Sequence, residues 1–173
     1  EIIGLHWLLA QTEGLYLTSP DASVRDATRD YVIALGDACA DLGGDLMVFG
    51  SPAQRNLLEG VSREAAMGHA AEVLAGALPR LAQRGVSICM EPLTSNETDF
   101  IQTCAEAVEL IERVESATGV ENFLLHQDVK AMVGQETDPV PVLVHRHADR
   151  LGHFHVNDTN LLGPGMGETD FVP

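Results

Sequence analysis

Short apolar runs alternate along the chain with longer segments in which apolar side chains recur at helical spacing. The runs cover residues 2–9, 46–49, 86–90, 123–125 and 151–156, and the fourth runs on to Asp128. In the segments 23–42, 62–84, 101–118 and 140–148, apolar residues return every three or four positions, which is typical of an amphipathic helix. The pattern predicts strands alternating with helices, and therefore a parallel sheet with helical crossovers.

The expected helix boundaries depend on capping residues. Ser23 and Asp26 have the spacing of a capping box, and Ser62 can cap the next helix. In the third helix we expect Ile101 on the inner face and Gly119 just after the end. Lys130 is expected to share a face with Asp128 if the fourth strand continues that far.

Two architectures fit the alternation: an open, doubly wound sheet and a closed β/α barrel. A doubly wound sheet usually has a glycine-rich phosphate turn after an early strand, but neither GxGxxG nor GxxxxGK[ST] occurs here. Polar residues instead follow the strands, and the C-terminal strand ends are where barrels carry their active sites. The polar residues at or after these ends are His6, Trp7, Arg55, Glu91, Asp128, His155, Asn157 and Asp158.

Three of these residues form a candidate metal site. Glu91, Asp128 and His155 follow neighbouring strands and offer the oxygen and nitrogen ligands that suit Mn²⁺, Mg²⁺, Co²⁺ or Zn²⁺. Such an ion would polarise a sugar carbonyl, and a carboxylate beside it could move a proton on the adjacent carbon. The simpler alternative is a barrel mouth lined by ordinary polar residues, in which Asp128 only caps a helix.

Two cationic residues near these strand ends have open roles. Lys130, the only lysine in the chain, can hold a substrate oxygen or tune a nearby carboxylate, or it can be a solvated loop residue. Arg55 can bind a substrate carboxylate or phosphate, or it can pair with an acidic surface neighbour.

Composition excludes some partners. The 173 residues include 26 acidic and 10 basic side chains, and the net charge of −16 argues against nucleic acid or an anionic membrane surface. No apolar run approaches the roughly 20 residues of a membrane span. Three cysteines without a CxxC pair fit buried thiols in a reducing compartment. We expect a cytoplasmic protein, with residues 1–173 forming one partial domain whose two ends both read as cut.

Several segments together resemble the sugar phosphate isomerase/epimerase family, which are xylose-isomerase-like TIM barrels and include the tagatose and psicose 3-epimerases. The matching segments are 4–9 (GLHWLL), 48–56 (VFGSPAQRN), 89–93 (CMEPL), 96–100 (NETDF), 127–132 (QDVKAM), 152–158 (GHFHVND) and 163–167 (GPGMG). They cover nearly the whole chain in the family's order. The resemblance implies an incomplete (β/α)₈ barrel with about five βα units.

The resemblance also implies chemistry. A divalent ion, Mn²⁺ first, would be held by Glu91, Asp128, His155 and one further Glu on a strand after residue 173. Glu91 and that Glu would move protons on the substrate carbon by way of a metal-stabilised enediolate, and Glu97 would contact the substrate. The substrate would be a small sugar, ketose or polyol derivative, and the protein could pair with a second copy of itself.

Two positions depart from the ketose 3-epimerase pattern. Those enzymes carry a His where Ala131 stands, and an Arg where Leu161 follows Asn160. The departures leave three interpretations open: a metal-dependent isomerase or epimerase, a metal-dependent lyase similar to inosose dehydratase, or an inactive fragment that lacks the last ligand.

Overall fold

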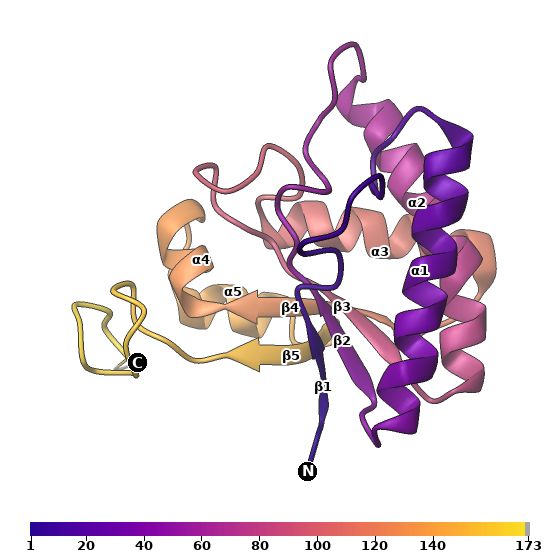
Figure 1. The fold of residues 1–173 in the computed structure, drawn as a ribbon. Coiled ribbons are helices and arrows are strands. Elements are labelled where there is room, and N and C mark those ends of the chain that lie inside the picture. The colour runs from indigo at the N-terminus through magenta and orange to yellow at the C-terminus, as the bar shows by residue number, and fades with distance from the viewer. Residues whose placement is uncertain (172–173) are drawn as a thin grey trace.

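The computed structural model describes residues 1–171 and consists of strands and helices in alternation (Figure 1). In chain order the elements are β1 (Gly4–His6), α1 (Ala22–Asp41), β2 (Leu46–Phe49), α2 (Arg63–Gln83), β3 (Ser87–Met90), α3 (Cys104–Thr118), β4 (Phe123–Asp128), α4 (Val129–Gln135), α5 (Val140–Arg146) and β5 (Leu151–His155). The fourth crossover therefore contains two short helices, where the sequence pattern predicted only the second.

The strand order decides between the two architectures. Neighbouring strands pair in parallel, and the order in the sheet follows the order in the chain, β1-β2-β3-β4-β5. A doubly wound sheet reverses its strand order once, whereas the wall of a barrel adds each strand beside the last. The helices α1, α2 and α3 accordingly lie side by side on one face of the sheet (Figure 1). The predicted partial barrel is confirmed: the sheet is a half-barrel of five strands.

The core lies between this face of the sheet and the helices. Met47, Ile88 and Leu125 are fully buried in the core cluster, against a helix α2 whose inner face is rich in alanine and leucine. Side chains alternate across a strand, so the residue that follows each of these three points to the opposite face of the sheet. That face carries Val48 and Cys89 and, at its upper end, the candidate ligands. The three cysteines are free and buried, as predicted.

Some predicted boundaries were confirmed and others were wrong. Ser62 caps α2, and Gly119 follows α3 in the left-handed conformation with φ 70°. The cap of α1 is Asp21, which accepts the Ser23 N–H at 2.8 Å, because its carboxylate precedes the first helical turn and Ser23 already lies within it.

Two further expectations were wrong for a shared reason, which is that helices begin at side chains able to cap them. Thr103 caps α3, so Ile101 lies in the preceding loop with φ 59°. Asp128 caps α4, so Lys130 lies on a helix and the strand does not continue past Asp128. Within residues 1–171, no helix combines the length and apolar character that crossing a membrane requires.

Candidate metal centre

Four side chains with metal-binding atoms converge at the C-terminal ends of β3, β4 and β5. Glu91 follows β3, His126 and Asp128 belong to β4, and His155 ends β5. Alternate residues of a strand share a face, so His126 and Asp128 point the same way, and the strand register aligns Asp128 with His155. One ligand atom from each of the four side chains lies within 4.8 Å of the others.

Glu91 occupies the middle of this cluster. Its side chain is almost fully buried, and its Oε2 lies 3.5 Å from His6 Nε2 while its Oε1 lies 3.7 Å from His126 Nε2. Both distances are long for a hydrogen bond to a carboxylate. Gly50 leaves room for the carboxylate, because a Cβ at that position would overlap Oε2. A buried carboxylate with contacts this long is costly unless a cation neutralises it.

Asp128 serves both the fold and the cluster. Its Oδ1 accepts the N–H of Ala131 at 3.0 Å and thereby caps α4. Its Oδ2 accepts a hydrogen bond from Asn157 Nδ2 at 2.9 Å and lies 3.6 Å from His155 Nδ1. Asn157 also accepts the backbone N–H of Lys130 through its Oδ1. The capping explanation is therefore correct for one oxygen, while the other oxygen faces the cluster.

His126 is a member of the cluster that sequence reasoning missed. Its side chain is fully buried, and neither ring nitrogen makes a hydrogen bond of ordinary geometry within residues 1–171. Burial, with smaller effects from His155 and His153, lowers the pKa of His126 to about 2, and the nearby His153 backbone opposes this only in part. His126 is therefore a neutral imidazole with a lone pair to donate. The one available signal was its two-residue spacing from Asp128, which places both on one face.

A pocket of about 260 Å³ opens beside the cluster. Eight of the ten predicted site residues line it: His6, Trp7, Glu91, Glu97, Asp128, Lys130, His155 and Asn157. Trp7 has φ 56°, an unusual conformation for a bulky residue, and its side chain is exposed at the pocket. Its ring stacks on His6 at 5.9 Å, so the pocket offers an aromatic face as well as polar groups.

Glu97 and Lys130 form an ion pair at the edge of this pocket. Lys130 Nζ lies 3.0 Å from Glu97 Oε1, and the Thr94 hydroxyl donates to Glu97 Oε2 at 2.8 Å. Burial raises the pKa of Glu97, but the hydrogen bonds from Lys130 and Thr94 outweigh it, so the pKa is lowered. Of the roles considered for Lys130, tuning a nearby carboxylate matches this contact.

Two predicted site residues lie away from the pocket. Arg55 is fully buried and donates to the backbone carbonyls of Glu91 at 2.7 Å and Ile101 at 3.2 Å. Its guanidinium thus holds the loop after β3 and does not face the pocket. Asp158 is also buried, and it accepts hydrogen bonds from backbone N–H groups of the following loop, including those of Thr159 and Gly167. Both side chains make contacts within the chain, and their contact with substrate stays a prediction.

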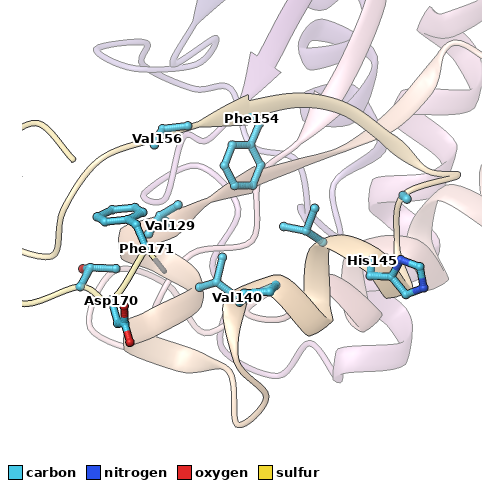
Figure 2. A pocket seen from close by; sticks show the side chains of 11 residues that line it. Val129, Val140, His145, Phe154, Val156, Asp170 and Phe171 are labelled. Atoms are coloured by element: carbon cyan, nitrogen blue, oxygen red, sulfur yellow. The ribbon is translucent and has the colours of Figure 1, made fainter. Parts of the chain in front are cut away.

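A second, larger pocket has a different character. It measures about 430 Å³ and lies between α4, α5 and β5, where Val129, Val140 and Phe154 supply apolar walls (Figure 2). Phe171 of the C-terminal segment lies near Val129 on the same side (Figure 2). Its lining contains one imidazole, that of His145, and one carboxylate, that of Asp170, whereas several carboxylates and imidazoles line the first pocket.

The residues present fit a divalent ion. The cluster combines two carboxylates with two imidazoles, a set that binds Mn²⁺, Co²⁺ or Zn²⁺. Glu91 lies 3.5 Å from His6 Nε2 and 3.7 Å from His126 Nε2, and His126 lacks hydrogen bonds of ordinary geometry within residues 1–171, so an ion between the carboxylate and the His126 imidazole would contact both. The chain thus forms a partial barrel with a candidate metal-binding cluster at its C-terminal edge and a pocket beside that cluster.

The family model of the xylose isomerase-like TIM barrels matches residues 2–173. The chain belongs to this family. The match covers nearly the whole sequence and agrees with the resemblance found in its motifs, and with the half-barrel seen in the structure.

Individual relatives of this family are sugar epimerases by name. The chain is 31% identical to the 3-dehydro-D-guloside 4-epimerase of Escherichia coli over 93 residues, which are 52% of this chain and 32% of that protein. It is 30% identical to the D-psicose 3-epimerase of Enterocloster bolteae over 82 residues, 47% of this chain and 26% of that protein. The crystal structure of a D-allulose 3-epimerase from Methylomonas sp. superposes with a TM-score of 0.80 and 21% identity, covering 92% of this chain and 54% of that chain.

The matched region is short relative to these proteins. It spans about a third or less of the two curated relatives and about half of the solved structure. The similarity in structure thus establishes the fold, and the family membership establishes the relation to sugar epimerases.

Proposed function

We propose that the protein is a metal-dependent isomerase or epimerase of a small sugar, a ketose or a polyol derivative, with Glu91 as a catalytic residue. The observation that carries the proposal is the buried Glu91 carboxylate, which faces both the candidate ligands and the pocket. The names of the two curated relatives, both sugar epimerases, support the same substrate class.

The metal would be held by Glu91, Asp128 and His155, as the sequence predicted, with Mn²⁺ the first choice and Mg²⁺, Co²⁺ or Zn²⁺ as alternatives. When bound, it would polarise the carbonyl and hydroxyl oxygens of a sugar and so acidify the C–H between them. Asn157 holds Asp128 in place through its 2.9 Å hydrogen bond, which fixes the direction of that ligand.

Glu91 is the residue placed to move the proton. One of its oxygens can face the ion while the other accepts a proton from the substrate carbon, in the manner of a general base. His6, 3.5 Å from Glu91 Oε2, limits the rotation of the carboxylate.

The rest of the pocket would bind and orient the sugar. Lys130 presents a hydrogen-bond donor and Glu97 an acceptor for the hydroxyl groups of the sugar, and their ion pair keeps the two side chains in place. Trp7 offers an exposed aromatic face for the C–H side of a sugar ring.

A lyase that dehydrates a keto-polyol is the second candidate. Ala131 and Leu161 both line the pocket at the positions where ketose 3-epimerases carry a His and an Arg. The pocket therefore offers apolar surface in place of two polar contacts to a linear ketose. The same ion and base would serve elimination of water from the adjacent carbon.

Turnover of a panel of ketoses, keto-glycosides and inososes, with Mn²⁺ or Co²⁺ added, tests the proposal. When the assay is run in D₂O, we expect an epimerised product that carries one deuterium from the solvent at the inverted carbon. If the protein is instead a lyase, we expect a dehydrated product. Glu91→Gln should abolish both, while Glu59→Gln, an exposed residue in the loop before α2, should not. Activity that survives exhaustive chelation would contradict metal dependence. A chain inactive on the whole panel would support the third reading, that of an inactive fragment.

A further inference from the structure

The loop between β3 and α3, residues 91–103, carries two of the carboxylates that line the pocket, those of Glu91 and Glu97. This loop is held by a segment from another part of the sequence. Each residue of the segment 55–57, in the connection between β2 and α2, makes a hydrogen bond to it. The placement of both carboxylates therefore depends on contacts from this segment.

Arg55 holds the loop near its two ends. Its guanidinium donates to the Glu91 carbonyl at 2.7 Å and to the Ile101 carbonyl at 3.2 Å. Ile101 has φ 59°, a strained conformation for a β-branched residue, which persists only where the surrounding structure enforces it. The Leu93 N–H donates to the same Ile101 carbonyl at 3.2 Å. Arg55 thus fixes where the loop starts, at Glu91, and where it returns.

Asn56 holds the middle of the loop, next to Glu97. Its Oδ1 accepts the Thr98 hydroxyl at 2.7 Å and the Asp99 N–H at 3.3 Å. Asp99 is held a second time, because its Oδ1 accepts the Leu57 N–H at 2.7 Å. Thr98 is almost fully buried and directly follows Glu97 in the chain. A contact that fixes Thr98 therefore also fixes the backbone of Glu97.

We infer that Asn56 is a positioning residue, which acts through Thr98 to set Glu97 for contact with the sugar. The inference rests on the proposed function and deepens it. Lys130 and the Thr94 hydroxyl orient the Glu97 carboxylate, at 3.0 and 2.8 Å. Asn56 fixes the backbone from which that side chain extends, so its loss would displace an acceptor that still has its own partners.

This division of contacts predicts which kinetic constant changes. Glu91, the residue proposed to move the proton, is held through Arg55, whereas Glu97 depends on Asn56. Loss of a contact that substrate and transition state share raises KM and leaves kcat unchanged. Asn56→Ala should raise KM by roughly tenfold, the effect of losing a hydrogen bond to a charged group. Its kcat and its Mn²⁺ affinity should stay within about twofold of the wild type.

Kinetics of the 173-residue chain with Mn²⁺, on the sugar of the panel that it turns over fastest, test the inference. Asn122→Ala is the matched control, because it also removes two hydrogen bonds, those from Asn122 Nδ2 to the Leu78 and Val86 carbonyls. Asn122 directly precedes β4, at the end of the strand away from the pocket, so this variant should leave KM unchanged.

Two further variants test whether Asn56 acts through Thr98 and Glu97. Thr98→Val removes the same hydrogen bond from its donor side and should raise KM as Asn56→Ala does. Glu97→Gln should raise KM as well, and adding Asn56→Ala to it should cause no further rise. Two residues that act as one unit are not additive in this way, whereas independent residues are.

Amide hydrogen exchange gives a readout that needs no turnover. The Asp99 N–H should exchange faster in Asn56→Ala than in the wild type or in Asn122→Ala, because its acceptor is gone. Unchanged Asp99 exchange in Asn56→Ala would overturn the holding of the loop itself.

The kinetic outcomes separate the inference from the proposed function. An unchanged KM in Asn56→Ala and Thr98→Val, or an equal rise in the Asn122→Ala control, would overturn the inference and leave the proposed function intact. Effects of Asn56→Ala and Glu97→Gln that multiply in the double variant would also overturn it. A wild-type chain that turns over no sugar of the panel would overturn the proposed function, and the role of Asn56 toward the sugar with it.

Discussion

Replacing Gly50 by alanine should damage the metal centre without damaging the fold. A Cβ at Gly50 would overlap Glu91 Oε2, and it would lie 3.1 Å from Glu91 Cδ and 3.5 Å from His6 Nε2. Real Cβ contacts essentially never fall below 3.0 Å, so the carboxylate oxygen must move by about 1 Å. The carboxylate is the end of a flexible side chain and can rotate away, which spares the backbone.

The size of the effect follows from this displacement. Holding a side chain about 30° from its preferred rotamer costs on the order of 0.5–1.5 kcal/mol. If Glu91 is a ligand, that energy appears as about a twofold to tenfold loss of Mn²⁺ or Co²⁺ affinity. Turnover should fall more, by roughly 100-fold, because a misplacement of 1 Å at a reacting group has an effect of that order.

Metal titration, turnover and urea unfolding of Gly50→Ala measure these effects. Gly68→Ala is the matched control, because Gly68 lies exposed on α2 and a Cβ there meets nothing within 4 Å. The control should gain about 0.5–1 kcal/mol in stability and bind metal normally. The reasoning is refuted if Gly50→Ala binds the ion as tightly as the wild type, or if it unfolds outright, since the clash would then have moved the backbone.

Three further predictions concern charge and burial. In the metal-free protein, burial lowers the pKa of His126 to about 2, whereas the pKa of a histidine in the unfolded chain is near 6.5. The free energy of unfolding should therefore fall by up to about 1.4 kcal/mol for each unit by which the pH drops below about 6.5. Urea unfolding between about pH 7.5 and 5.5 measures this loss, and His126→Leu should flatten the profile. Arg55→Met should lower the free energy of unfolding in urea by about 1–3 kcal/mol, because the Glu91 carbonyl loses its donor, whereas the Ile101 carbonyl keeps its hydrogen bond from the Leu93 N–H. An unchanged unfolding midpoint would contradict the role given to Arg55. Lys130→Met should change stability by less than about 1 kcal/mol, since its ion pair is partly exposed, and should leave Co²⁺ affinity unaltered; a loss of Co²⁺ binding would place Lys130 in the metal site.

Much of the fold could be predicted because strands and helices space their apolar residues along the sequence with different periods. Each strand run was short, apolar and followed by polar groups, and the structure has a strand in every one of these runs. The wrong predictions concern helix boundaries, where a single capping side chain decides at which residue the helix begins. Asp21 and Ser23 are both good capping residues, and the choice between them depends on which carboxylate or hydroxyl meets the first free N–H. Helix α4 was missed because it begins directly after Asp128, the last residue of β4, so that its first residues could be taken for a continuation of the strand.

The site could be predicted in part for a similar reason. Strand ends meet at one edge of a parallel sheet, so position alone brings Glu91, Asp128 and His155 together. The position of a residue in the sequence does not show how deeply its side chain is buried below that edge. His126 looks like an ordinary strand histidine, and only the fold shows that its side chain is fully buried beside Glu91. Arg55 could not be predicted either, since the loop that receives its guanidinium comes close only after folding.

The divided carboxylate of Asp128 links two parts of the molecule. Its Oδ1 holds the first turn of α4, while its Oδ2 faces the cluster. An ion that draws this carboxylate forward also pulls on the start of α4, the helix that carries Lys130 to its partner Glu97. Binding of a metal at Oδ2 and placement of Lys130 would thus be linked through this one side chain.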